Sequence, residues 1–208
     1  MLSDLHQRQL RAFWRNRVAV IGAVMSLLLI LVALLAETLS PYDPVEQNVF
    51  YRLTPPELSH PFGTDSYGRD ILSRIIWGSR ISLAVGIGSV ALGMVLGSFL
   101  GMIAAFKGEK MGGGIMRAVD ILLCFPAEIL AIMVLVVLGQ GLDKLIITIG
   151  IVMTLRFARL SYGSTLSLKE REYIEAARSI GARGFRILFR YILPNILGEI
   201  LVMSSLWT

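Results

Sequence analysis

The chain has 208 residues, of which 55% are hydrophobic and 17% are charged, and its formal net charge is +5. A soluble domain of this length carries about 25% charged residues, so the composition excludes an ordinary soluble enzyme, a disordered chain and a disulfide scaffold. The single cysteine, Cys124, excludes an intrachain disulfide and a zinc site built on several thiolates. The composition predicts an all-α integral membrane protein.

Long uncharged stretches predict about five helical spans, since a helix crosses the hydrocarbon core in about 20 residues. We expect them at residues 18–39, 81–106, 118–138, 145–166 and 196–208. The third is interrupted by Pro126, and the fourth has only a short uncharged run between Lys144 and Arg156. The last is still apolar at Thr208, so a truncated, non-transporting membrane fragment remains an alternative.

The basic residues predict the orientation. With residues 1–17 as a cytoplasmic N-terminal segment and the weak fourth stretch counted as a span, most Lys and Arg fall on the cytoplasmic side, as the positive-inside rule requires. The positive charge thus points to a bilayer and not to nucleic acid. Residues 40–80 hold five of the seven prolines and are predicted as an extracytoplasmic loop followed, from Asp65, by an interfacial helix. Residues 81–208 would form the core of the protein.

Within the second expected span, small residues recur at every fourth position. Such a stripe allows another helix backbone to approach closely, which we favour over a pore-lining role. Its members are Ser89, Gly93, Gly97 and Gly101.

Residues able to perform catalysis or bind a metal are sparse. Glu128 lies deep in the third expected span, where a carboxyl group is costly, so it should face a bundle interior or an aqueous translocation path. His6 and His60 lie outside the spans with no cluster of further ligands, and we assign no catalytic or metal site. The chain also contains no G-x-x-x-x-G-K-[ST] loop, so it does not bind ATP in that way.

Residues 169–195 are predicted as a cytoplasmic pair of short amphipathic helices. In the first helix, apolar residues recur at helical spacing, and Gly181 ends the helix. The second helix has the same spacing and is expected to end at Pro194. On periodicity alone, a pair lying on the membrane surface is the alternative. The two apolar faces comprise Tyr173, Ala176, Ala177 and Ile180, then Phe185, Leu188, Phe189 and Ile192.

The order of residues in this segment is more specific than its period. Glu175-Ala176-Ala177, three residues, Gly181, nine residues and Tyr191-Ile192-Leu193-Pro194 resemble the EAA loop of membrane subunits of ABC importers, departing only at Tyr191. The rest of the chain resembles the C-type permease subunit of dipeptide and oligopeptide ABC importers. The matching segments are Phe13 to Arg17, Pro41 to Pro44, His60 to Asp65, Gly68 to Asp70 and Arg80 to Leu83.

That resemblance implies a type I ABC importer permease fold with six spans, about five of them present, and a cytoplasmic helix-turn-helix coupling loop. It implies a bacterial or archaeal cytoplasmic membrane, a second related permease subunit, two ATPase subunits and an extracytoplasmic substrate-binding protein. The chain itself would be non-catalytic and bind no cofactor, since ATP and Mg²⁺ would bind the ATPase subunits. The implied function is inward transport of di- or oligopeptides by alternating access.

The resemblance also implies roles for single residues. Glu175 and Arg178 would make polar contacts to an ATPase subunit, Ala176 and Ala177 would allow close packing, and Gly181 would form the turn. Leu193 and Pro194 complete the motif. Permeation of nickel or another small solute is the alternative within the family, and an intramembrane enzyme is the remaining one.

Overall fold

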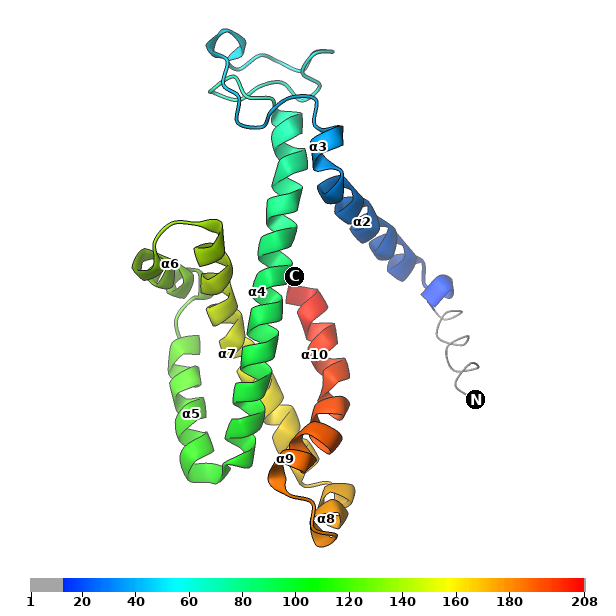
Figure 1. The fold of residues 1–208 in the computed structure, drawn as a ribbon, viewed down its shortest axis with the longest axis vertical. Helices are drawn as coiled ribbons and strands as arrows, with labels where there is room; N and C mark the ends of the chain where they lie inside the picture. The colour runs from blue at the N-terminus through cyan, green and yellow to red at the C-terminus, as the bar shows by residue number, and fades with distance from the viewer. Residues whose placement is uncertain (1–12, 208) are drawn as a thin grey trace. The chain divides into compact units, whose positions relative to one another are not determined.

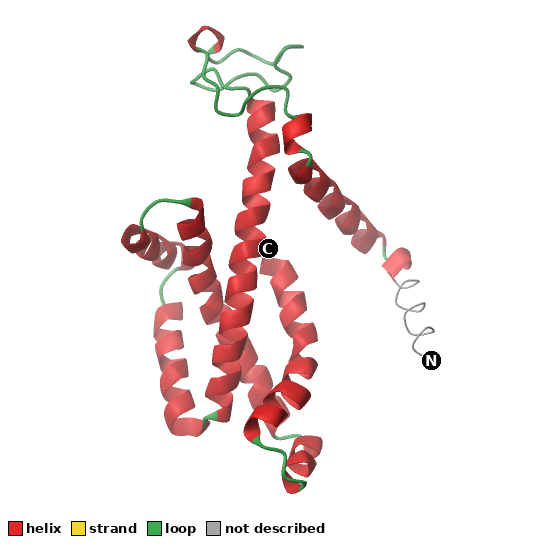
Figure 2. Ribbon diagram, viewed as in Figure 1, coloured by secondary structure: helices red, strands yellow, loops and turns green. Residues whose placement is uncertain are grey.

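The computed structural model describes residues 13–207, and all regular structure in that range is helical (Figure 2). Most of the expected cytoplasmic segment 1–17, His6 included, lies outside the described residues, as does Thr208. The chain divides into two compact units, one ending at Ala84 and one beginning at Val85. Each unit is described by itself, because their relative position is not determined.

The first unit contains α2 (Arg17–Leu34), α3 (Ala36–Leu39), a loop with a short helix η1 (Val49–Tyr51), and the start of α4 (Ile71–Phe106). The Asn16 side chain begins α2 by accepting hydrogen bonds from the N–H groups of Val18 and Ala19, at 3.1 and 3.3 Å. Almost every apolar side chain of α2 is exposed on this chain. That exposure suits a helix surrounded by lipid or by other subunits.

Helix α4 is longer than the sequence predicts. The helix expected before residue 81 is present and is continuous with the second span, because residues 71–106 form one uninterrupted helix. Asp70 caps its beginning by accepting the N–H of Ser73 at 2.7 Å, and no proline interrupts the turns that follow. At 1.5 Å per residue the helix is about 54 Å long, so it extends beyond a hydrocarbon core of about 30 Å.

The second unit holds the rest of α4 and the helices that follow it (Figure 1). Helix α7 lies at its centre, with contacts to α5, α6 and α10. The buried core is apolar, and Met102, Phe157, Ile192 and Ile196 are among its members. The helices are α5 (Gly108–Leu123), α6 (Ala127–Leu138), α7 (Leu142–Lys169), α8 (Glu172–Ser179), α9 (Gly184–Ile187), the π-helical η2 (Leu188–Ile192) and α10 (Leu193–Trp207).

The third expected span, 118–138, is not one straight helix. Helices α5 and α6 meet at 97° across residues 124–126. Pro126 stands at the break, since it lacks the N–H that would continue α5 and disfavours helical backbone at the residue before it. The pair is therefore a broken span or a re-entrant segment.

The stop expected at Pro194 is also wrong. Residues 184–207 run on as one helical segment, and the turn before the proline is a π turn in which the Leu193 N–H donates to Leu188 O. A wider turn removes the demand for an N–H at Pro194 and the clash of its ring with the preceding turn.

Four helical segments in the described part of the chain are long and apolar enough to cross a membrane, and the bent pair would add a fifth. They are Arg17–Leu34, Ile71–Phe106, Leu142–Lys169 and Gly184–Trp207. The predicted all-α membrane fold with about five spans is thereby confirmed.

Candidate functional site

Helix α8 carries most of the residues singled out in the EAA-like segment. Ile174 and Ala177 are its buried residues, with 0% and 3% of their surfaces exposed, whereas Glu175, Ala176 and Arg178 are exposed. The apolar face expected from the sequence is therefore only partly correct. The packed side runs through Ile174 and Ala177, which leaves Ala176 free on the outer side.

The outer side of α8 is itself partly apolar. Tyr173 and Ile180 are 43% and 83% exposed, and Glu175 and Arg178 lie between them in the chain. After the turn, too, an apolar residue expected to pack is exposed. Phe185 is 79% exposed and stacks on Phe189 at 5.3 Å between ring centroids. An exposed mixture of apolar and charged side chains is typical of a surface that binds another protein.

Gly181 ends α8 with the backbone geometry expected of it. Its φ is 85°, its N–H donates to Arg178 O at 2.9 Å, and the N–H of Ala182 donates to Ala177 O at 3.0 Å. These two bonds form a Schellman motif, which needs a left-handed residue at this position. The turn between α8 and α9 is therefore defined by backbone hydrogen bonds.

The residues on either side of α8 and its turn, Lys169 and Gly184, contact the end of α4. Lys169 Nζ donates to Ala105 O at 3.2 Å and lies 5.7 Å from the centre of the Phe106 ring. A Cβ at Gly184 would be 2.7 Å from that same ring, so only glycine lets α9 approach it this closely. Figure 1 shows α8 and the α4–α5 turn at one end of the helical unit. Displacement of α8 would thus be transmitted to α4 and α7.

Leu193 and Pro194, the last residues of the motif, begin α10, with Leu193 partly buried and Pro194 exposed. Beside α8 lies a hollow of about 340 Å³. It is lined by Leu166, Lys169, Glu170, Glu175 and Arg178. Two of the motif residues, Glu175 and Arg178, thus line one hollow.

The small-residue stripe of α4 lies against α7. Ser89 is fully buried and its hydroxyl donates to Ile146 O at 3.2 Å. A Cβ added at Gly93, Gly97 or Gly101 would collide with Met153, with Thr154 and Phe157, or with Ala158, respectively. Backbones this close gain van der Waals contact along their whole length.

Glu128 is not placed deep in a bundle. It stands in the first turn of α6, just after the bend, and its side chain is exposed. No hydrogen bond or ion pair joins it to another residue in the described part of the chain. A carboxylate in the first turn is favoured by the positive end of the helix dipole.

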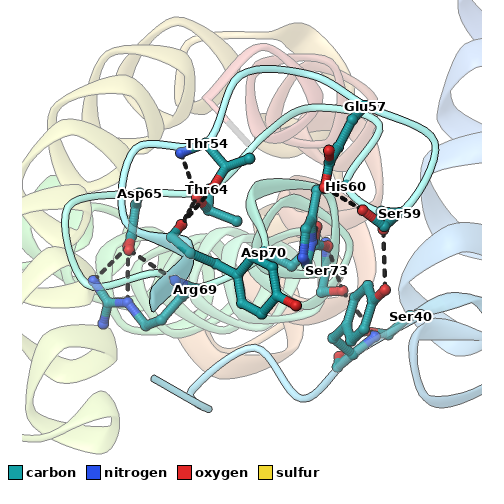
Figure 3. Close-up of polar contacts among 12 residues, drawn as sticks. Ser40, Thr54, Glu57, Ser59, His60, Thr64, Asp65, Arg69, Asp70 and Ser73 are labelled. Carbon is teal, nitrogen blue, oxygen red and sulfur yellow. Dashed lines mark hydrogen bonds and ion pairs between the residues drawn. The ribbon is translucent and has the colours of Figure 1, made fainter. Parts of the chain in front are cut away.

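Sequence reasoning missed the ordered core of the loop between α3 and α4 (Figure 3). His60 Nδ1 lies 2.9 Å from Asp70 Oδ1, and the two residues are 8% and 3% exposed. The other Asp70 oxygen accepts the N–H and the hydroxyl of Ser73, each at 2.7 Å. Ser73 Oγ in turn accepts the N–H of Tyr42 at 3.1 Å, and the Tyr42 ring packs on His60 at 4.8 Å.

These bonds tie the beginning of the loop to its end. Burial raises the pKa of Asp70, but the hydrogen bonds from Ser73 and His60 outweigh it, so the net effect is a lowered pKa. The histidine had seemed isolated because its partner is ten residues away, and only the fold of the loop brings them together. The signal available in the sequence was the segment His60 to Asp70 itself, with two acids and two glycines.

A second carboxylate holds the tip of the loop. Asp65 accepts hydrogen bonds from the Arg69 side chain at 2.8 Å and from the backbone N–H groups of Tyr67 and Arg69 at 2.8 and 3.0 Å. Burial opposes the charge, yet these bonds lower the pKa of Asp65 to about 2. Gly68 completes the turn with φ 74°, where a Cβ would collide with the backbone of Asn48.

Two known families match most of the chain. Residues 93–206 match the model of the binding-protein-dependent transport system inner membrane component family. Residues 5–56 match the N-terminal transmembrane domain of oligopeptide transport permease C. The first match includes the α4–α7 seam and the whole EAA-like segment.

Several curated relatives cover the same range. The chain is 44% identical to the glutathione transport system permease protein GsiD of Pectobacterium atrosepticum, over 94% of this chain and 65% of the relative. It is 40% identical to the dipeptide transport system permease protein DppC of Alkalihalophilus pseudofirmus, over 92% of this chain and 63% of the relative. It is 37% identical to the di/tripeptide transport system permease protein DppC of Pseudomonas aeruginosa, over 98% of this chain and 71% of the relative.

The chain thus spans about two thirds of the length of the curated relatives it matches. Its apolar helices and these matches identify a multi-pass protein of the inner membrane. The chain belongs to the family of binding-protein-dependent transport system inner membrane components.

Proposed function

We propose that this chain is a permease subunit of an ABC importer that moves di- and oligopeptides inward by alternating access. The relatives are named for dipeptides, di/tripeptides, oligopeptides and glutathione, which favours peptide cargo over nickel. ATP and Mg²⁺ would bind two partner ATPase subunits. A second permease subunit and an extracytoplasmic binding protein would complete the importer, and the N-terminus would be cytoplasmic.

The observation that carries this proposal is the construction of the α8 end. Ile174 and Ala177 anchor α8 inward, Gly181 defines the turn, and Lys169 and Gly184 attach the turn to α4. The outward residues remain available to a partner. A conformational change of a docked ATPase subunit can therefore displace α8 and, through it, the membrane helices.

The proposed coupling is tested by enlarging an exposed residue of α8. Ala176→Trp should leave insertion and folding intact but abolish peptide uptake, because the added ring prevents docking of the ATPase subunit. The matched control is Ala23→Trp on the exposed surface of α2. Uptake of labelled peptides, assembly by affinity pulldown and ATP hydrolysis are measured on the complete importer.

Gly181→Pro provides a second test, because proline fixes φ near −65° whereas the native φ is 85°. We expect a chain that still inserts but no longer links ATP hydrolysis to uptake. Wild-type uptake by both Ala176→Trp and Gly181→Pro would refute the coupling role. A panel of labelled dipeptides, longer peptides and Ni²⁺ then identifies the cargo of the wild-type importer.

A further inference from the structure

A polar groove runs between α7 and α10, and its lining residues differ from those of the hollow beside α8. Across it, Ser164 Oγ donates a hydrogen bond to Glu199 Oε2 at 2.6 Å. The groove has a volume of about 500 Å³. It is lined by Leu160, Gly163, Ser164, Ser167, Leu168, Asn195, Ile196 and Glu199.

Ser164 and Glu199 lie within two helical segments that are long and apolar enough to span a membrane, Leu142–Lys169 and Gly184–Trp207. Glu199 is six residues beyond the start of α10 at Leu193, which is about 9 Å along the helix axis. Ser164 is five residues before the end of α7 at Lys169, about 8 Å from that end. A glutamate side chain is too short to extend over such a distance to the interface, unlike lysine or arginine.

Contact with lipid is energetically unfavourable for the polar lining of this groove. A charged side chain within the bilayer costs about 2.5–3.5 kcal/mol even on the most lenient scale, so such residues face a bundle interior or water. Glu199 and Asn195 are nevertheless exposed on this chain. The other exposed side of α10 carries Leu197 and Leu201 and suits lipid.

The groove has room for water. Gly163, Ser164 and Ser167 leave a recess on α7, and Ser164 holds only one oxygen of the Glu199 carboxylate. The second oxygen remains available to a ligand, and a carboxylate in a polar recess is the natural partner of an ammonium group.

We propose that this groove lines the water-filled cargo path on the side of α8, and that Glu199 there contacts the positively charged amino groups of the cargo. The inference rests on the proposed function and adds to it a path-lining surface and a preference for cationic peptides. Ser164 is a positioning residue, since it orients the carboxylate without contacting cargo.

Access to water is tested first, on the full-length subunit assembled with its partners in everted membrane vesicles. Cys124→Ser removes the only cysteine, and Ser167→Cys is compared with the control Leu201→Cys in that background. A membrane-impermeant thiol reagent should label position 167 at least roughly tenfold faster, because only a thiol in contact with water forms the reactive thiolate. Equal rates would overturn the proposal and show that a helix covers the groove.

The charge preference is tested by uptake of two peptides that differ only in lysine against norleucine. Glu199→Gln should lower the lysyl-to-norleucyl uptake ratio about fivefold, the scale of one solvated ion pair. Ser164→Ala should lower it less, and Glu37→Gln, an exposed carboxyl of the first unit, should not change it.

Different results would refute the role of Glu199 and the proposed function. If the wild-type importer carries both peptides and Glu199→Gln leaves the ratio unchanged, the role of Glu199 is refuted and the proposed function stands. If the wild-type importer carries neither peptide, the proposed function is refuted, and the labelling of Ser167→Cys still decides whether the groove is open to water.

Discussion

The loop between α3 and α4 and the α4–α7 seam are both tightly constructed, but by opposite means. The loop depends on polar side chains, of which the buried Asp70 and the partly exposed Asp65 accept several hydrogen bonds each. The seam depends on the absence of side chains at Gly93, Gly97 and Gly101. In the loop the polar groups hold the backbone in place, and in the seam the backbones themselves are in contact.

The difference follows from the surroundings of each region. A loop in water lacks the regular backbone hydrogen bonds of a helix, so side chains must satisfy its N–H and C=O groups. Helices in lipid have satisfied their backbones internally and gain no hydrophobic free energy by association, so close packing must supply the stability. Substitutions should therefore act on the two regions by different mechanisms.

The largest effect is expected from Asp70→Asn. Asp70 makes three hydrogen bonds to His60 and Ser73, and a hydrogen bond to a charged group contributes about 1.5–3 kcal/mol, so replacing the carboxylate should cost about 3 kcal/mol or more. Hydrogen exchange of the loop amides should accelerate accordingly, whereas the α4–α7 seam should not change. The control is Asp43→Asn, an exposed residue whose oxygen accepts only the N–H of Val45. Unchanged exchange in Asp70→Asn would contradict a polar core in the loop.

The seam should respond to the addition of a single methyl group. Gly101→Ala places a Cβ against the Ala158 backbone and should destabilise the helical unit by about 1–3 kcal/mol. Gly78→Ala, in the same helix but with nothing within 4 Å of the new Cβ, should be neutral or stabilising. Thermal unfolding of the two purified variants in detergent measures the contrast, and equal midpoints would argue against close packing.

Acid should affect the two regions unequally, with the smallest effect of the three. Because the pKa of Asp65 is lowered from 3.8 to about 2, its contribution to stability is complete above about pH 4 and is lost as the pH falls towards 2. Amide exchange near Asp65 should therefore increase between pH 4 and pH 2, after correction for the intrinsic rate. The seam residues do not ionise, so the α4–α7 amides are the internal control, and a parallel change there would contradict this account.

The candidate site was predicted in part from the sequence. The spacing from Glu175 to Pro194 located the segment, and Gly181 has the left-handed backbone that its position at a helix end indicates. The packed side of α8 was not predictable, because a period of 3.6 residues identifies an apolar side but not which part of it finds a partner within the chain. Ile174 was selected by packing and Tyr173 was left outside.

The amino-acid sequence by itself determined the class of the protein, the number of apolar helices and the motif at the α8 end, because these depend on composition and local period. The tertiary structure alone decided which distant groups meet: His60 with Asp70, Ser164 with Glu199, and the stripe of α4 with α7. It also decided that Pro126 separates two helices, whereas Pro194 is accommodated by a π turn. A proline disfavours a regular helix at both sites, and the packing around each one determines how the chain resolves the conflict.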